Sequence, residues 1–129
     1  MNSIQRIIGA FGGMPALRQH GSITVQKGNR RLDITLIKYG LQYGEAICVE
    51  QSTEDLTDRE MHFAVSAEIW LPYYLRIPAQ VEVIAHSIQT DAFVSACLQE
   101  HATVWDMALF REGFDRLTHE QFPLFAGMA

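Results

Sequence analysis

The feature that most limits the fold is a pair of segments, residues 22–27 and 30–39, in which apolar and polar side chains alternate. Between them lies Gly28-Asn29, a dipeptide that supplies the positive φ of a two-residue turn, so the pattern predicts an antiparallel hairpin. The turn length fixes the register, which pairs Val25 with Leu32, Ile23 with Ile34 and Thr24 with Asp33. Apolar residues then meet on one side and polar residues on the other, so the hairpin offers one face to a core.

The rest of the chain continues this pattern. Further strands are expected over residues 45–51, 61–66 and 68–77. The last of these is irregular, because Pro72 suits a sheet edge or a bulge. Residues 52–60 are polar and are expected to form a loop, while residues 80–88 fit either another strand or a loop.

Two helices complete the expected fold. Residues 3–11 place isoleucines on one helical face and are followed by Gly12-Gly13, which ends the helix. A longer helix begins after the N-cap candidate Thr90 and stops at Gly113. Its expected apolar stripe consists of Phe93, Ala96, Cys97, Val104, Trp105, Ala108 and Leu109. The sequence therefore predicts an α+β protein, with an antiparallel meander of four to six strands and both helices packed on one face.

Composition supports one globular domain over residues 1–129, with residues 118–129 as a loose tail. The chain is 48% hydrophobic and 19% charged, which are globular values. No apolar run reaches the about 18–20 residues of a membrane span, and no signal-peptide core follows the amino terminus. We expect a cytoplasmic protein that does not enter a membrane. Cys48 and Cys97 lie among apolar residues and predict buried thiols rather than a disulfide.

Charge is sorted along the chain. Residues 1–40 carry a formal charge of +5, and residues 41–129 carry −10. This asymmetry predicts two electrostatically distinct surfaces, and it bears on partners rather than on fold.

The acidic half contains a dense group of carboxylates. Its members are Glu50, Glu54, Asp55, Asp58 and Glu60. A calcium-binding loop requires a glycine, and this stretch has none. We therefore interpret these five residues as an acidic patch that binds a protein partner.

The basic half projects its charge at the hairpin turn. Lys27, Arg30 and Arg31 flank that turn, with Arg18 as a fourth cation. Arginine and lysine at the tip of a β-ribbon would contact nucleic-acid phosphates. The overall pI near 5.4 weakens this alternative.

Aromatic residues concentrate in one segment. Trp70, Tyr73, Tyr74 and Arg76 are residue types enriched in interface hot spots. If this segment is an edge strand, these side chains would form an interface, including one between two copies of the chain.

The sequence offers no catalytic signature. Cys97 and His101 are four apart on a helix and could share a metal, but two ligands without a motif do not define a site. Cys48 lies in the middle of a strand, where burial would raise its pKa and hide it from a substrate. We expect no metal, no cofactor and no catalytic residue.

Four motifs in order resemble an uncharacterised family of small proteins carried on bacterial plasmids, phages and integrative elements. They are Ala10-Phe-Gly-Gly13, Arg59-Glu-Met-His-Phe-Ala-Val65, Trp70-Leu-Pro-Tyr-Tyr-Leu-Arg76 and Trp105-Asp-Met-Ala-Leu-Phe-Arg-Glu-Gly-Phe114. The family has proline where Arg59 stands, an acid where Ala64 stands, and a polar run in place of residues 75–78. The resemblance implies no known activity and no site residues. It implies a setting on a mobile element.

We therefore expect a non-enzymatic binding protein that acts through protein–protein contacts, as a mobile-element accessory protein or an anti-restriction or anti-CRISPR antagonist of host defence. The alternative is a nucleic-acid-binding protein that uses the basic hairpin tip at residues 27–31. A small metal-dependent or cysteine hydrolase is the third hypothesis.

Overall fold

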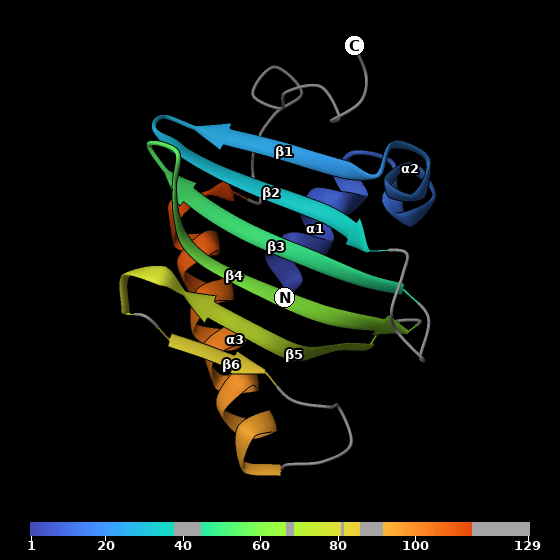
Figure 1. Ribbon diagram of the computed structural model, residues 1–129. Coiled ribbons are helices and arrows are strands. Elements are labelled where there is room, and N and C mark those ends of the chain that lie inside the picture. Colours follow the sequence, from blue (N-terminus) through green and yellow to red (C-terminus); the bar gives the residue numbers. More distant parts are fainter. Residues whose placement is uncertain (38–44, 67–68, 81, 86–91, 115–129) are drawn as a thin grey trace.

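The protein is a six-stranded antiparallel sheet with helices on one face, as seen in a computed structural model that describes residues 1–37, 45–66, 69–80, 82–85 and 92–114 (Figure 1). The elements in order are α1 (Asn2–Ala10), α2 (Gly13–His20), β1 (Ser22–Lys27), β2 (Arg30–Ile37), β3 (Glu45–Thr53), β4 (Leu56–Ser66), β5 (Ile69–Ile77), the 3-10 helix η1 (Pro78–Gln80), β6 (Glu82–Ala85) and α3 (Ala92–Glu112). Each strand pairs with its neighbour in the sequence, from β1 to β6. The predicted α+β class, the meander and the one-sided placement of the helices are confirmed.

The first hairpin has the predicted register. Val25 pairs with Leu32 and Ile23 with Ile34, and all four side chains are fully buried. Gly28 has a φ of 63°, a conformation that costs glycine little. Alternation of apolar side chains and turn length together were therefore enough to fix this part of the sheet.

The amino-terminal region contains a second helix that the sequence pattern did not reveal. α1 ends at Ala10, close to the end predicted before Gly12-Gly13. The φ of Gly12, 116°, lies in the left-handed region that favours glycine. The chain then enters α2 directly, and Pro15 lies in its first turn, where a missing N–H breaks no helical hydrogen bond. Gly12-Gly13 thus separates two helices instead of leading into a loop.

The expected loop at residues 52–60 is wrong, because most of this stretch belongs to β3 and β4. The two strands are joined at Glu54-Asp55, where φ is 50° and 68°. Two positive φ values make a tight hairpin turn, which normally selects glycine or asparagine. The sequence signal was absent because acids occupy both turn positions.

The irregularity expected at Pro72 is confirmed, but the strand is not the edge of the sheet. The register of β4 and β5 shifts between His62 and Phe63, which pair with Tyr74 and Pro72, so Tyr73 is an extra residue in a bulge. Residues 82–85 form β6, which pairs with the second half of β5. β6 therefore covers that half of the strand.

The core lies between the sheet and the helices. α3 contributes Leu98, Ala102, Trp105 and Leu109 to it, whereas Val104 is 54% exposed. The expected stripe on α3 is therefore wrong at Ala96 and Val104, which are both exposed. Apolar residues occur on more than one side of this helix, so periodicity could not select one. Phe93 and Thr90 are outside the part of the chain whose side chains the structure describes, as are residues 118–129.

Polar contacts attach α3 to the rest of the molecule, among them contacts of Trp105 and Asp106. The buried Trp105 indole Nε1 donates a hydrogen bond of 2.8 Å to Oε1 of Gln51 on β3. At the start of α1, the backbone N–H of Ser3 donates to Oδ1 of Asp106 at 2.8 Å, so a carboxylate of α3 satisfies a free amide at a helix N-terminus. Among the described helices, none is long and apolar enough to cross a membrane.

Candidate functional site

The sheet face opposite the helices, here called the open face, carries three carboxylates in a line across neighbouring strands. Glu50 on β3 lies directly opposite Asp33 on β2 and Glu60 on β4. We call Asp33, Glu50 and Glu60 the carboxylate row. Like charges directly opposite one another destabilise a sheet, so this arrangement needs compensation.

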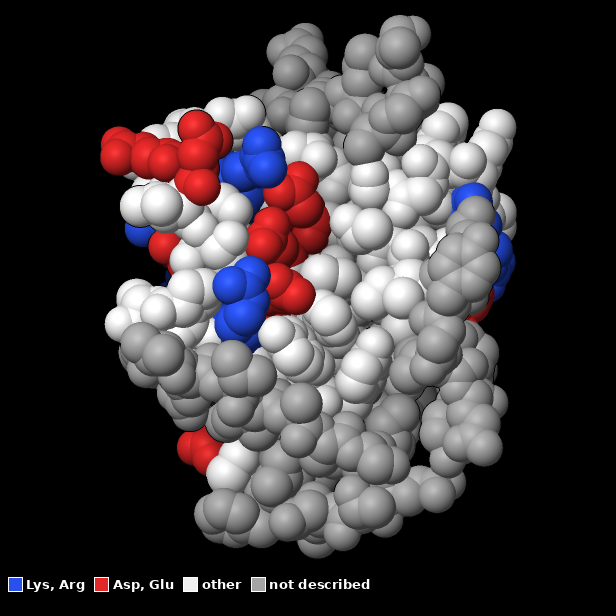
Figure 2. All heavy atoms as spheres, viewed as in Figure 1, with Lys and Arg blue, Asp and Glu red and all other residues white. Residues whose placement is uncertain are grey.

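Two arginines compensate the row from its two ends. Arg31 Nε lies 2.9 Å from Oδ2 of Asp33. Arg76, which pairs with Glu60 in the sheet, places Nη2 2.8 Å from Oε1 of Glu60 and 3.7 Å from Oε2 of Glu50. Figure 2 shows acidic and basic side chains beside one another on this face. Glu50, in the middle, has the weakest ionic compensation.

Two threonine hydroxyls add hydrogen bonds to the row. Thr24 Oγ1 donates to Oδ1 of Asp33 at 2.7 Å, and Thr57 Oγ1 donates to Oε2 of Glu50 at 3.1 Å. Every member of the row therefore has a polar partner in the free protein, and the row is held in a defined geometry.

Glu60 has the most buried carboxylate of the row, with 16% of its side chain exposed. Burial raises the pKa of Glu60, but hydrogen bonds with Arg76 and His62 and electrostatic attraction to these side chains outweigh burial, so the pKa lies below its usual value. Glu60 is therefore ionised at neutral pH.

A second line of side chains crosses the sheet beside the carboxylate row. Cys48 on β3 lies opposite His62 on β4, and His62 lies opposite Tyr74 on β5. The His62 and Tyr74 rings stack with centroids 4.5 Å apart, and the bulged Tyr73 meets the imidazole edge-on at 5.9 Å. The two tyrosine rings therefore pack against the His62 imidazole from the side of β5.

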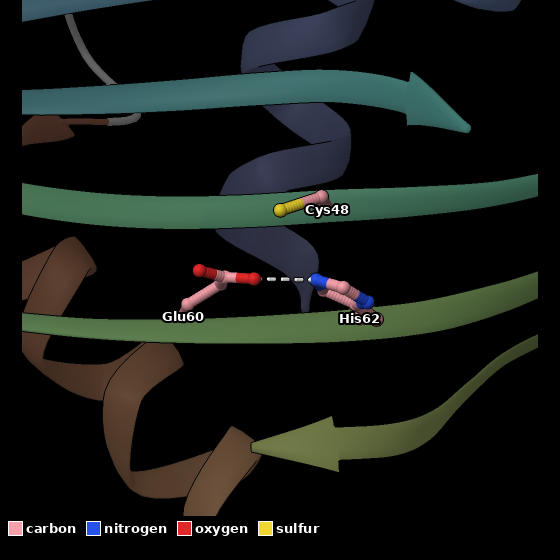
Figure 3. Close-up of side chains that lie close together, drawn as sticks. All are labelled: Cys48, Glu60 and His62. Carbon is pink, nitrogen blue, oxygen red and sulfur yellow. Dashed lines mark hydrogen bonds and ion pairs between the residues drawn. The ribbon is translucent and has the colours of Figure 1, made fainter. Parts of the chain in front are cut away.

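Cys48, Glu60 and His62 form a compact group where the two lines meet (Figure 3). Their ligand-type atoms all lie within 4.8 Å of one another, and His62 Nε2 is 2.6 Å from Oε2 of Glu60. Burial, assisted by the negative charges of Glu60 and Glu50, raises the pKa of Cys48 to about 12. The Cys48 thiol is therefore protonated at neutral pH and is a poor nucleophile, as expected from its position in a strand.

The predicted acidic patch is divided between two places. Glu50 and Glu60 lie on the open face, whereas Glu54 and Asp55 are exposed at the β3–β4 turn. Asp58 follows that turn and accepts a hydrogen bond of 2.6 Å from Thr53 Oγ1. The five acids do not form one continuous surface group of equivalent residues.

The basic hairpin tip is paired with acids. Lys27 donates to the backbone oxygen of Glu112, and Arg30 forms an ion pair with the carboxylate of the same residue. The backbone N–H of Glu54 donates to the oxygen of Asn29 at 3.1 Å, so the acidic turn lies beside the basic one.

Arg18 is also paired with an acid: Nε of Arg18 lies 2.8 Å from Oε2 of Glu45. Cations of the early part of the chain therefore meet anions of the later part. The expectation of two separate charged surfaces is wrong at Arg18 and Arg30.

The predicted aromatic interface is also divided. Trp70 packs on the core side, where its ring centroid is 5.6 Å from that of Phe63. Tyr73, Tyr74 and Arg76 belong to the open face and surround His62 and Glu60.

Sequence reasoning missed Asp33 and His62 as site residues and placed Cys48 among inert thiols. The sequence did contain one signal for this site. Cys48 and Glu50 are two residues apart in one strand, and Glu60 and His62 are two apart in the next, so each pair lies on one face of its strand. In the part of the chain that the structure describes, no third ligand-type side chain joins Cys97 and His101 in a compact group.

The fold and site define an α+β protein in which the described helices cover one sheet face, and the opposite face bears carboxylates, a thiol and an imidazole. Comparison with known protein families, curated proteins and solved structures found no match for this chain.

Proposed function

We propose that this chain is a non-enzymatic binding protein that recognises a partner protein through the open face of its sheet. The carboxylate row is the observation that carries this proposal. Three acids in register on adjacent strands oppose the stability of the sheet, and residues that weaken a fold are characteristic of functional surfaces.

Glu50 is the centre of the proposed contact. Its side chain is 29% exposed, and its nearest cation in the described part of the chain, Arg76, is 3.7 Å away and bonded more closely to Glu60. An arginine or lysine from the partner would complete the compensation of Glu50. Opposite charges of this kind accelerate encounter and select the partner.

The other two hypotheses have less support. A phosphate at the hairpin tip would have to displace Glu112 from Lys27 and Arg30. A cysteine hydrolase needs a thiolate, and Cys48 is held protonated with a pKa of about 12. Self-association through β5 is weakened because Trp70 packs toward the core.

The resemblance to proteins of mobile elements directs the choice of partner. We propose a bacterial host-defence protein of the restriction or CRISPR type, in which the carboxylate row would meet a basic surface made for nucleic acid. Acids that occupy such a surface would compete with the nucleic acid for it.

The test is affinity capture from a bacterial lysate with quantitative mass spectrometry. The bait is the full chain, compared with Asp33→Asn/Glu50→Gln, which removes two charges while keeping the shape of both side chains. Glu100→Gln is the matched control, because Glu100 is an exposed acid on α3. The proposal expects one protein captured by the wild type and the control and depleted at least tenfold with the double variant.

Purified partner then allows association to be followed across a salt series. Charge-driven encounter predicts that the association rate falls as ionic strength rises, and that the double variant removes most of this dependence. Equal capture by all three baits, or association that salt does not alter, would contradict the proposed surface.

A further inference from the structure

We propose that Cys48, Glu60 and His62 form a binding site for one divalent transition-metal ion of the Zn²⁺ class. These side chains come from neighbouring positions of β3 and β4, and their ligand-type atoms lie within 4.8 Å of one another. In a tetrahedral zinc site, bonds of about 2.0–2.3 Å separate neighbouring ligand atoms by roughly 3.3–3.8 Å. Binding of an ion would therefore require side-chain rotations that bring the three atoms to these separations; His62 Nε2 and Glu60 Oε2 are 2.6 Å apart in the metal-free protein.

The chemistry of the group selects the class of ion. A sulfur, an imidazole nitrogen and a carboxylate oxygen together are the donor set of Zn²⁺ and its neighbours, whereas Ca²⁺ and Mg²⁺ prefer oxygen alone. The sheet fixes the backbone of all three residues, so little ordering is required on binding.

Glu50 adds a second carboxylate, and a fourth side chain, at the same place. It is two residues from Cys48 along β3 and directly opposite Glu60 on β4, so the four residues mark the corners of a square on the open face. This square contains two carboxylates, whose negative charge attracts a cation. The same negative charge contributes to the raised pKa of the Cys48 thiol, and a divalent ion in the square would favour the thiolate.

An ion can reach the site from solvent, but it would compete with Arg76 for Glu60. The side chains of His62 and Glu60 are 22% and 16% exposed, so an ion can enter from the open face. Arg76 shares Glu60 in the metal-free protein, and a bound ion would have to compete with this guanidinium. Tyr73 and Tyr74 limit access from the side of β5.

The experiment uses the purified full chain alone, so it is independent of the proposed partner binding. Chelator-treated protein is titrated with Co²⁺, whose thiolate complexes show a ligand-to-metal charge-transfer band, and then with Zn²⁺ as a competitor. We expect one Co²⁺ per chain, a charge-transfer band, and loss of that band on addition of one equivalent of Zn²⁺.

The cysteine that produces the band is identified by matched variants. The chain has two cysteines, so Cys97→Ser leaves Cys48 as the only thiol and should retain the band. Cys48→Ser should abolish it, and His62→Gln should weaken Co²⁺ binding by about 100-fold or more. The Cys97→Ser result alone shows whether Cys48 is the thiol that binds Co²⁺, even if the other variants fail to fold. Absence of the band in the wild type, or its loss in Cys97→Ser, would overturn the site.

Discussion

Replacing Arg76 with glutamine tests whether the carboxylate row costs stability that this residue offsets. In the wild type, Arg76 Nη2 lies 2.8 Å from Glu60 and 3.7 Å from Glu50. The variant keeps a polar side chain of similar length but leaves two carboxylates on adjacent strands with one fewer cation.

The size of the effect follows from distance and solvent exposure. Two unit charges about 4 Å apart interact by roughly 4 kcal/mol at an effective dielectric constant of 20. The Arg76 side chain is 35% exposed, and solvent screening of such pairs reduces the net value to about 1 kcal/mol. Uncompensated repulsion between Glu50 and Glu60 adds a few tenths of a kcal/mol. We expect Arg76→Gln to lose about 1–1.5 kcal/mol of unfolding free energy at pH 7.

The deficit should depend on pH in a defined direction. The pKa of Glu60 is lowered in the folded protein, so its ionised form contributes stability that is present above the unfolded pKa and is lost as pH falls through the folded pKa. The difference between the wild type and Arg76→Gln should therefore be full at pH 7 and should shrink below about pH 4.5, the ordinary value for a glutamate.

Urea unfolding, followed by circular dichroism at pH 7 and pH 3, measures the loss of unfolding free energy in Arg76→Gln and its dependence on pH. Arg111→Gln, an exposed arginine on α3, is the control and should change stability by less than about 0.5 kcal/mol. A deficit of the same size at both pH values would refute the electrostatic reasoning and assign the loss to packing of the aliphatic stem of Arg76.

Three further predictions concern the core, a turn and the thiol. Gln51→Leu removes the acceptor of the buried Trp105 indole and should cost about 1–3 kcal/mol in urea unfolding; an unchanged midpoint would contradict the importance of this bond. Asp55→Gly places glycine where φ is 68° and should stabilise the protein by about 0.5–1 kcal/mol, seen as a melting temperature higher by a few degrees. Cys48, with a pKa of about 12, should react with iodoacetamide at pH 7 roughly 10³-fold more slowly than a free thiol, with a rate that rises about tenfold per pH unit. Mass spectrometry of alkylated Cys97→Ser protein checks this, and a rate independent of pH would be inconsistent with the raised pKa.

The sheet could be predicted from the sequence wherever apolar alternation was joined to a turn signal. Gly28-Asn29 provided such a signal, and the register of β1 and β2 followed from it. Glu54-Asp55 forms an equally tight turn without glycine or asparagine, so the sequence indicated a loop. Local residue preferences were overridden there by pairing of β3 with β4.

The candidate site was predictable only in part, because it depends on contacts between strands. Glu50, Glu60 and Arg76 were recognised as candidates, but in two separate groups. Their meeting with Asp33, Cys48 and His62 requires the register of four strands. A one-residue slip in any of these strands would turn its side chains to the other face.

The contact between Ser3 and Asp106 has a consequence for synthesis on the ribosome. Asp106 is 103 residues beyond Ser3, so α1 lacks this carboxylate until most of the polypeptide has been translated. The meander can form hairpin by hairpin from local pairs, but the side of it that α3 shields stays bare until the last helix arrives. Nascent chains at that stage would expose apolar surface of the kind that chaperones bind.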